Sequence, residues 1–293
     1  MQYVNLGSLK FSRIVQGFFR THAWGMDAKQ LHEHMAACID RGVTTFDTAD
    51  VYGGGGRCEK AMGEALVGFN RDQYQLVTKA GICRDFVTQT NHYDTTYEYL
   101  TNSCKASAQR LGVDYIDLFL IHREDPMIDP HEAGRALLDL KKEGVIREFG
   151  VSNFDPFKYQ AVDKATGGQL VTNQIEVNPC CFEHFNSGMI DYLTGEKIAP
   201  MVWSPLAGGK TFTSDEPQYV AARKAIEELA EKYNVLPGTI VYAWILNHPM
   251  NALPIVGSGK LERLDEAIAA LDLKLDRIDW FKVYRASGQQ IIR

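Results

Sequence analysis

The chain has 293 residues, of which 45% are hydrophobic and 23% are charged, and its formal net charge is -6. This is the composition of a soluble globular protein, and no segment reaches the roughly 20 apolar residues of a membrane span. The acidic balance argues against nucleic acid or an anionic membrane as a partner. Because Met1–Lys10 lacks the charged-then-apolar layout of a secretory signal, we expect a cytoplasmic protein.

The cysteines and histidines do not form a metal-binding pattern. Six cysteines are scattered along the sequence without a Cys-x-x-Cys pair, and a chain with a large core does not depend on disulfides. Cys180 and Cys181 are adjacent, and we interpret them as free loop thiols rather than as a strained vicinal disulfide. His32 and His34 lie two residues apart and do not share a helix face, so no metal is expected.

The first predicted element is a small hairpin, with strands at Gln2–Leu6 and Leu9–Phe11. Eight short apolar runs follow, each ending in small or polar residues. These predicted strands are Arg13–Gln16, Thr44–Phe46, Gln75–Thr78, Asp117–Ile121, Glu148–Val151, Val171–Ile175, Pro200–Trp203 and Ala252–Val256. Amphipathic segments that predict helices lie between them, including Lys29–Arg41, Thr96–Leu111, His131–Glu143 and Tyr219–Tyr233.

Alternating strands and helices predict a parallel sheet of the α/β class, and eight repeats predict its closure into a (β/α)8 TIM barrel. Two extra helices are expected near the C-terminus, at Pro237–Asn247 and Asp276–Ser287. Asp155 before Pro156 has the pattern of a helix N-cap followed by proline at the first helical position. No linker or change of composition divides the chain, so residues 1–293 are predicted to form one barrel domain.

Four polar residues mark the ends of the predicted strands. Asp47, Lys79 and His122 each follow an apolar run, and Tyr52 lies five residues after Asp47. In a parallel barrel these side chains gather at the carboxyl-terminal rim, where such barrels keep their chemistry. A carboxylate, a phenol, an amine and an imidazole together predict proton transfer to a carbonyl oxygen, without a metal.

Longer motifs surround these four residues. They are Gly42–Gly53, Leu76–Lys79, Asp117–His122, Gly150–Phe154 and Trp203–Leu206. In this order and spacing, from Phe11 to about Leu271, the chain resembles the aldo-keto reductase superfamily, and more narrowly its bacterial oxidoreductase-type branch. The resemblance implies an NADP-dependent oxidoreductase that reduces an aldehyde or ketone to an alcohol by hydride transfer from a nicotinamide.

The resemblance assigns the catalytic roles to Asp47, Tyr52, Lys79 and His122. Tyr52 would protonate the carbonyl oxygen as general acid, but a phenol with the ordinary pKa near 10 holds its proton strongly. We expect the Lys79 ammonium to lower this pKa, and Asp47 to keep the ammonium charged and oriented. His122 would hydrogen-bond the substrate oxygen and hold the carbonyl in line.

The segment after the last predicted strand is the expected site of the adenosine 2′-phosphate, which implies NADPH rather than NADH. It is not a P-loop, because Leu261 stands where a P-loop has Ser or Thr. It opens the predicted helix Leu261–Leu271, whose first amides and dipole favour an anion. The cofactor contacts expected here come from Gly257, Ser258, Lys260, Arg263 and Glu266. Lys260 would compensate for a basic residue that many members carry in the place of Gly257.

Three further strand ends complete the cofactor site by resemblance. Ser152, Asn153 and Gln174 are expected to lie at the nicotinamide carboxamide, and Trp203 to stack on the nicotinamide ring. The residues expected along the pyrophosphate are Ser204, Leu206 and Gly208.

The substrate is expected to be a small-molecule carbonyl compound. Phe18, Phe19 and Trp24 follow the first barrel strand and would line an apolar pocket above the nicotinamide, together with His122. We interpret Arg123 as the partner of Glu124 or Asp125 rather than as a substrate anchor. Candidate lids span residues 178–195 and 207–217. The self-contained barrel predicts a monomer.

Two other classes of protein stay open. One is a nicotinamide-binding sensor or regulatory subunit with slow or no turnover, which would keep the same cofactor residues. Tight NADPH binding without turnover of any carbonyl distinguishes it. The other is a barrel enzyme that forms a Schiff base on Lys79, which borohydride trapping would reveal.

Overall fold

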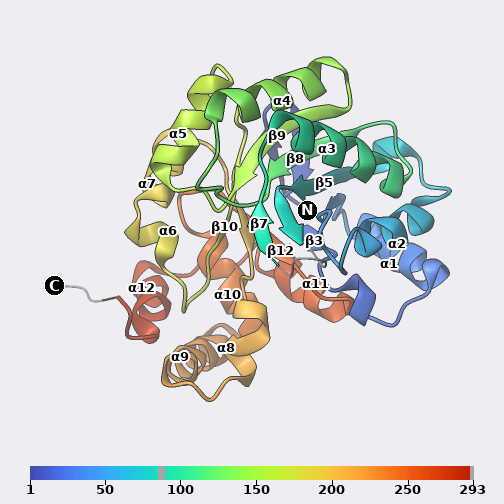
Figure 1. The fold of residues 1–293 in the computed structure, drawn as a ribbon. Helices are drawn as coiled ribbons and strands as arrows, with labels where there is room; N and C mark the ends of the chain where they lie inside the picture. The colour runs from blue at the N-terminus through green and yellow to red at the C-terminus, as the bar shows by residue number, and fades with distance from the viewer. Residues whose placement is uncertain (85–89, 291–293) are drawn as a thin grey trace.

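The structure is a computed structural model that describes residues 1–84 and 90–290. Its centre is a closed barrel of parallel strands in the order β10, β11, β12, β3, β4, β5, β8, β9. Their bounds are β3 (Val15–Gly17), β4 (Thr45–Asp47), β5 (Gln75–Ala80), β8 (Ile116–Ile121), β9 (Ile146–Ser152), β10 (Asn173–Glu176), β11 (Met201–Trp203) and β12 (Leu253–Val256). Figure 1 looks onto the carboxyl-terminal end of this barrel, with helices around it. The predicted (β/α)8 TIM barrel is confirmed.

The helices that follow the strands cover the outside of the barrel. The longer ones are α1 (Ala28–Asp40), α2 (Arg57–Leu66), α3 (Tyr97–Leu111), α4 (Pro130–Lys142), α5 (Pro156–Ala165), α7 (Met189–Gly195), α9 (Pro217–Tyr233), α10 (Pro237–Leu246), α11 (Leu261–Ala269) and α12 (Arg277–Ala286). Two single turns are α6 (Glu183–Asn186) and α8 (Lys210–Thr213). Asp155 caps α5 and Pro156 opens it, as the sequence predicts.

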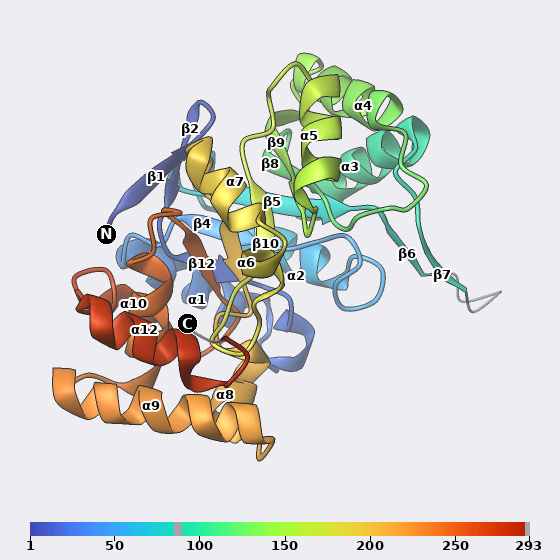
Figure 2. The same cartoon turned by 90° about the vertical axis from the view of Figure 1, so that its left-hand side faces the viewer.

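The amino-terminal hairpin closes one end of the barrel. Its strands β1 (Tyr3–Leu6) and β2 (Leu9–Ser12) pair antiparallel, which confirms the predicted hairpin. Leu6 and Phe11 belong to the same buried cluster as Val77 and Leu118, which lie on the barrel strands. Figure 2 shows the hairpin at one end of the barrel and β6 and β7 at the other. Because the hairpin covers the amino-terminal end of the barrel, the active site is expected at the carboxyl-terminal rim.

The strand register brings the four polar residues together. Asp47 ends β4 and pairs in register with Val77 of β5. Lys79, two residues further along β5, pairs with Leu120 of β8, and His122 comes directly after that strand. Because neighbouring parallel strands end at the same rim, residues far apart in sequence meet there.

Several elements were not anticipated from the sequence. After β5 the chain forms a short antiparallel ribbon of β6 (Ile82–Arg84) and β7 (Asn91–Tyr93), which has no strong alternation in its sequence. The helix α2 was also missed, since four glycines with positive φ, Gly53–Gly56, hide its start. These glycines form the turn that leads from Tyr52 into α2.

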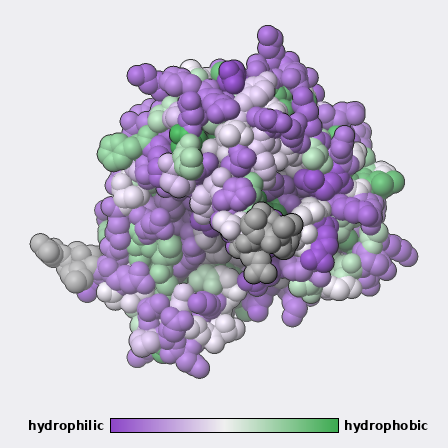
Figure 3. All heavy atoms as spheres, viewed as in Figure 1, coloured by the Kyte–Doolittle hydropathy of each residue, from purple (hydrophilic) through white to green (hydrophobic). Residues whose placement is uncertain are grey.

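The carboxyl-terminal face is largely hydrophilic, with hydrophobic residues scattered over it (Figure 3). Within residues 1–84 and 90–290, no helix combines the length and apolar character required to traverse a bilayer.

Candidate active site

Asp47 and Lys79 form a buried ion pair at the carboxyl-terminal rim. The Lys79 ammonium donates to Asp47 Oδ1 at 2.8 Å and to the Thr48 carbonyl at 2.6 Å, and its side chain is fully buried. Burial by itself lowers the pKa of Lys79, but the charges and hydrogen bonds of Asp47 and Tyr52 outweigh it and raise the pKa above its ordinary value. Lys79 therefore stays charged in the core.

A hydrogen bond across the barrel holds the second oxygen of this carboxylate. Asp47 Oδ2 accepts from Gln174 Nε2 at 2.8 Å. Gln174 lies on β10, which is four places from β4 in the ring of eight strands. The resemblance places Gln174 at the cofactor, and the structure adds its hydrogen bond to the Asp47 carboxylate.

Tyr52 lies between two rings above this ion pair. Its ring centroid is 4.7 Å from that of Phe19 and 5.5 Å from that of His122, both in edge-to-face geometry. The Lys79 ammonium is 5.1 Å from the Tyr52 ring centroid. Burial raises the pKa of the Tyr52 phenol, and the Lys79 charge only partly offsets this. Lys79 lowers this pKa, as expected, but burial of the ring has the larger effect and in the opposite direction.

His122 is a neutral imidazole in this environment. Burial, followed by the charges of Lys79 and Arg123, lowers its pKa well below the ordinary value. Its Nδ1 is buried and has no hydrogen-bond partner among the described residues. We call Asp47, Tyr52, Lys79 and His122 the tetrad; the fold brings all four together.

The residues expected at the nicotinamide form one hydrogen-bonded group beside the tetrad. Asn153 Nδ2 donates to Ser152 Oγ at 2.8 Å and to the His122 carbonyl at 3.3 Å. The indole of Trp203 donates to Asn153 Oδ1 at 2.8 Å. Ser152 Oγ in turn donates to the Gln174 carbonyl at 2.8 Å. Asn153 has a positive φ of 62°, a strained conformation of the kind that clusters at functional sites.

The segment after β12 is shaped to admit a ligand. A Cβ added at Gly257 would meet no atom within 4 Å, and Lys260, the N-cap residue of α11, makes no side-chain capping hydrogen bond. Lys260 is exposed and has no ion-pair partner among the described residues. The open amides and the free ammonium fit a phosphate group.

Arg263 is less available than expected. Its guanidinium pairs with the buried carboxylate of Glu266, three residues further along α11. The assigned pyrophosphate residues lie on the loop after β11, where Ser204 has a φ of 49° and Gly208 a φ of 67°. Arg20 donates to the Gly208 carbonyl at 3.4 Å and so links this loop to the segment after β3. Leu206, the third, is partly buried and packs on the core.

The expected apolar substrate residues separate into two groups. Phe19 is 51% exposed and contacts Tyr52, so it lies where a substrate residue is expected. Phe18 is fully buried and packs edge-on against Phe46, so it does not fit the role predicted for it. Trp24 packs on Phe18 and beneath Gly259, where a Cβ would meet its indole at 2.7 Å. It supports the loop after β12 instead.

The interpretation of Arg123 is wrong. Glu124 pairs with Lys158 at 2.8 Å, and Asp125 accepts from the Thr95 hydroxyl at 2.8 Å. The Arg123 guanidinium instead lies over the Trp203 ring, 5.4 Å from its centroid. No carboxylate among the described residues forms an ion pair with it. The two neighbouring acids are engaged elsewhere, which the sequence alone does not reveal.

Arg123, the residue after His122, lines a cavity of about 240 Å³. We call it the polar cavity. Its lining includes Arg123, Asn153, Glu176, Glu183, His184 and Trp203. Two of its lining residues, Asn153 and Trp203, are expected at the nicotinamide. The sequence did not predict Glu176 or His184 as site residues.

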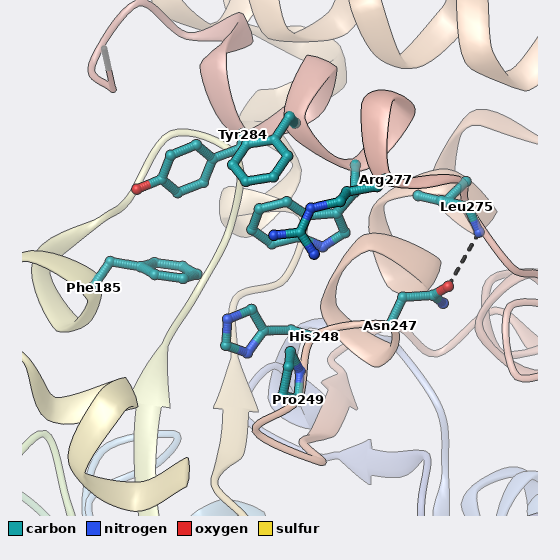
Figure 4. Close-up of a pocket in the computed structure, with 9 residues that line it drawn as sticks. Phe185, Asn247, His248, Pro249, Leu275, Arg277 and Tyr284 are labelled. Carbon is teal, nitrogen blue, oxygen red and sulfur yellow. Dashed lines mark hydrogen bonds between the residues drawn. The ribbon is translucent and has the colours of Figure 1, made fainter. Parts of the chain in front are cut away.

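A second cavity, of about 520 Å³, is lined largely by aromatic rings and by none of the tetrad (Figure 4). We call it the aromatic cavity; its lining includes Phe185, His248, Arg277, Trp280, Phe281 and Tyr284. Trp280 stacks on Trp244 and on Tyr284, with centroids 5.5 and 5.3 Å apart.

A buried polar group behind the tetrad was also missed. Glu59 of α2 is fully buried; it accepts from the Thr78 hydroxyl at 2.5 Å and pairs with Arg110 at 2.6 Å. Burial, followed by the Glu59 charge, raises the pKa of Asp50 to about 7. Asp50 contacts the tetrad through the main chain, because its backbone N–H donates to the Lys79 carbonyl at 3.0 Å.

A closed barrel with this tetrad at its rim is the architecture of a carbonyl-reducing barrel enzyme. The model of the aldo/keto reductase family matches residues 13–286, and the chain belongs to this family.

Curated relatives match almost the whole chain. The "Uncharacterized oxidoreductase YcsN" of Bacillus subtilis is 40% identical, and the match covers 98% of each chain. The oxidoreductase YdhF of Escherichia coli is 38% identical, over 95% of this chain and 94% of the relative. The 6-dehydroglucose reductase of Agrobacterium fabrum is 37% identical, over 99% of this chain and 100% of the relative.

A solved structure is similar as well. The thermostable aldo-keto reductase Tm1743, crystallised with the inhibitor epalrestat, has a TM-score of 0.82 and is 25% identical; the match covers 97% of this chain and 99% of that one. These relatives make the protein an oxidoreductase of the carbonyl-reducing kind.

Proposed function

We propose that this protein is an NADPH-dependent reductase that converts an aldehyde or ketone to an alcohol with Tyr52 as the general acid. The observation that carries the proposal is the position of the Tyr52 phenol, between a buried Asp47–Lys79 ion pair and the neutral ring of His122. Hydride arriving at a carbonyl carbon leaves negative charge on its oxygen, and a proton donor must meet that charge.

Each member of the tetrad has a separate task. Tyr52 gives its proton to the carbonyl oxygen, and the Lys79 ammonium stabilises the phenolate that remains. Asp47 holds the ammonium in place, itself fixed by Gln174. The neutral imidazole of His122 hydrogen-bonds the carbonyl oxygen and orients it. Burial raises the pKa of Tyr52 and so opposes proton release, and the charge and hydrogen bond of Lys79 act against this effect.

The residues present fit a nicotinamide dinucleotide phosphate. When bound, the reduced nicotinamide supplies the hydride. Trp203, Ser152 and Asn153 would hold the nicotinamide end, and Ser204, Leu206 and Gly208 the pyrophosphate. Gly257, Ser258 and Lys260 would hold the 2′-phosphate, because Lys260 is exposed and not paired with a described carboxylate. Arg263 would contact this phosphate while it keeps its ion pair with Glu266.

The test is NADPH oxidation by purified protein over a panel of aldehydes, ketones and quinones. We expect wild type to reduce at least one of them, and Tyr52→Phe to lose about 10²–10⁴-fold in kcat while NADPH still binds. Tyr219→Phe on α9 is the matched control and should behave as wild type. Near-normal turnover by Tyr52→Phe would contradict the assignment.

The same experiment decides the alternative function. Tight NADPH binding by wild type without turnover of any carbonyl would favour a nicotinamide-binding sensor or regulatory subunit. A cytoplasmic location and a monomeric state complete the proposal, and gel filtration tests the second.

A further inference from the structure

We propose that Glu59 is a positioning residue for the tetrad, because it fixes the loop that carries Tyr52 against the strand that carries Lys79. The inference rests on the proposed function, since it concerns how the proton donor Tyr52 is held in its working position. Glu59 belongs to α2 and acts through Thr78, the residue before Lys79 on β5. The sequence did not predict either residue as part of the site.

Glu59 is a fully buried carboxylate whose two oxygens are both engaged. Thr78 Oγ1 donates to Oε1 at 2.5 Å, and Arg110 Nε donates to Oε2 at 2.6 Å. A buried charge requires such partners, because an unpaired one is strongly disfavoured. An apolar side chain of similar volume would pack there without this requirement. What distinguishes the carboxylate is therefore the set of elements that it connects.

The partner Thr78 stands directly before Lys79 on β5. Consecutive residues of a strand point to opposite faces, so one of the two side chains faces the inside of the barrel and the other faces the surrounding helices. Lys79 reaches Asp47 inside, whereas Thr78 reaches Glu59 of α2 outside. The hydrogen bond from Thr78 thus attaches α2 to the strand position next to the ammonium.

The loop that carries Tyr52 is also attached to β5 at its start. The backbone N–H of Asp50 donates to the Lys79 carbonyl at 3.0 Å. The Lys79 ammonium donates to the Thr48 carbonyl at 2.6 Å. Both bonds lie before Tyr52 in the chain, so they place the start of the loop against Lys79.

The end of the same loop depends on α2. Four glycines with positive φ, Gly53–Gly56, separate Tyr52 from this helix, and glycine gives the backbone conformational freedom. The Cys58 N–H donates to the Tyr52 carbonyl at 3.4 Å, so the first turn of α2 holds the loop. Glu59, the next residue, holds that turn against β5. Tyr52 is therefore attached on both sides to the strand of Lys79.

Arg110 of α3 completes this arrangement. Besides its ion pair with Glu59, its guanidinium donates to Ser107 Oγ at 3.0 Å. It also packs on the glycine turn, since a Cβ added at Gly56 would meet Arg110 Cδ at 2.5 Å. The cation thus neutralises Glu59 and supports the turn before α2 at the same time.

The position of the phenol determines how well it can transfer its proton. The Lys79 ammonium is 5.1 Å from the Tyr52 ring centroid, and its stabilisation of the phenolate falls with distance. A misplacement of about 1 Å can lower a rate by on the order of 10²-fold, even when its cause lies away from the reacting atoms. Loss of the bond between Thr78 and Glu59 should therefore lower kcat more than it changes KM.

The first test changes the hydroxyl of Thr78. Thr78→Val removes it and keeps the shape of the side chain, and Thr78→Ser keeps it. With NADPH and the carbonyl compound that wild type reduces fastest, Thr78→Val should lose about tenfold in kcat, while KM and the NADPH dissociation constant stay within about twofold. Thr78→Ser should retain most of the wild-type kcat. Because kcat is expressed per NADPH-binding site, unfolded protein does not contribute to the difference.

Thr166→Val is the matched control for this test. Thr166 is buried at the end of α5, and its hydroxyl donates to the Asp163 carbonyl at 2.9 Å. Its removal should leave kcat as in wild type.

A second set of variants separates position from stability. Glu59→Met should lower kcat by about tenfold or more, and it should also lower the urea midpoint of unfolding, since Arg110 loses its partner. Glu59→Met combined with Arg110→Met replaces the ion pair by apolar side chains. The midpoint should then return toward wild type while kcat stays low. Glu64→Met, at an exposed position of the same helix, is the matched control and should change neither quantity.

The outcomes distinguish this inference from the proposed function. Wild-type kcat in Thr78→Val, or recovery of kcat together with stability in the double variant, would overturn the positioning role and leave the proposed function standing. Equal losses in kcat, KM and NADPH affinity would also overturn it, since the whole site would then be distorted. Absence of turnover by wild type on every carbonyl would overturn the proposed function, and the positioning role with it.

Discussion

The polar cavity and the aromatic cavity differ most in what their polar atoms do. In the aromatic cavity two of them serve the fold: the Trp280 indole donates to the Trp244 carbonyl at 2.8 Å, and Asn247 bonds both Leu273 and Leu275. Arg277 lies over the Phe281 ring, 5.5 Å from its centroid, without an ion-pair partner among the described residues. In the polar cavity the guanidinium of Arg123 and Nδ1 of His184 have no such protein partner within the described ranges. The larger cavity is thus part of the packing, and the smaller one is ready for a ligand. The polar cavity also shares Asn153 and Trp203 with the residues expected at the nicotinamide, and the aromatic cavity shares none of them.

The two cavities are neighbours along the chain. The single turn α6 contributes His184 to the polar cavity and Phe185, the next residue, to the aromatic one. Residues adjacent in sequence can therefore line different cavities. Mutations can test the polar cavity and the aromatic cavity separately.

The largest effect is expected on the polar side. Lys79→Met should lower kcat for carbonyl reduction by about 10³-fold or more, because the phenolate loses its cation. It should also destabilise the fold by about 3–5 kcal/mol, since Asp47 is left as an unpaired buried charge. Turnover assays and urea unfolding measure the two effects.

Two variants control this experiment. Lys60→Met, at an exposed position of α2, removes a lysine without touching the site and should show neither effect. Asp47→Asn combined with Lys79→Met should recover part of the stability and none of the activity. Full activity in Lys79→Met would refute the role of the cation.

In the aromatic cavity, a substitution is expected to affect stability more than activity. Trp280→Ala should lower the free energy of unfolding by about 3–5 kcal/mol, because the ring stacks on Trp244 and Tyr284. At a temperature where the variant stays folded, its kcat/KM should remain within about twofold of wild type. Trp280→Phe should lose less stability. A strong loss of kcat/KM in folded Trp280→Ala would show that this cavity also serves the reaction.

A pH-dependent effect of intermediate size is expected at Asp50. Its pKa of about 7 lies above the ordinary value of 3.8, so the folded state holds the proton more tightly than the unfolded state. Stability therefore falls as pH rises from about 4 to 7, when the folded carboxyl must ionise. Asp50→Asn removes this loss and should gain on the order of 1–3 kcal/mol on wild type between pH 5 and pH 8.

Denaturant unfolding at the two pH values measures this difference. Asp215→Asn, on the loop before α9, is a matched control and should show no such change. An equal effect of Asp50→Asn at both pH values would mean that ionisation is not its cause.

The smallest effect is expected at the cofactor loop. Lys260→Ala should weaken NADPH binding by about tenfold and NADH binding hardly at all, because only NADPH carries the 2′-phosphate. Fluorescence titration of both cofactors measures the ratio. Lys274→Ala, an exposed position before α12, should change neither affinity. Tighter binding of NADH than of NADPH by wild type would contradict the NADPH preference.

The sequence predicts the barrel and the tetrad because both depend on local signals. Each of Asp47, Lys79 and His122 follows an apolar run, and parallel strands bring run ends to one rim. The sequence also predicts that Lys79 lowers the pKa of Tyr52, but the larger opposing effect of burial could not be predicted, since it depends on how the folded chain encloses the ring.

The remaining errors have the same cause. Arg123 does not pair with Glu124, because Glu124 pairs instead with Lys158, which is 34 residues away in the sequence. Phe18 and Phe19 are adjacent and both aromatic, yet one is buried in the core and the other faces Tyr52. Which side chain faces which neighbour is decided by long-range packing, and the spacing of residues in sequence does not encode it.

The hydrogen bond between Asp47 and Gln174 joins strands on opposite sides of the ring. One strand belongs to the first half of the chain and the other to the second half. A half-barrel folded alone would hold at most one partner of this bond, so the Asp47 carboxylate is fully anchored only when the two halves meet. Enzymatic turnover is therefore a reporter of ring closure. In refolding it should be the last signal to return, after helical content, and two separately expressed halves should regain it only by assembling with each other.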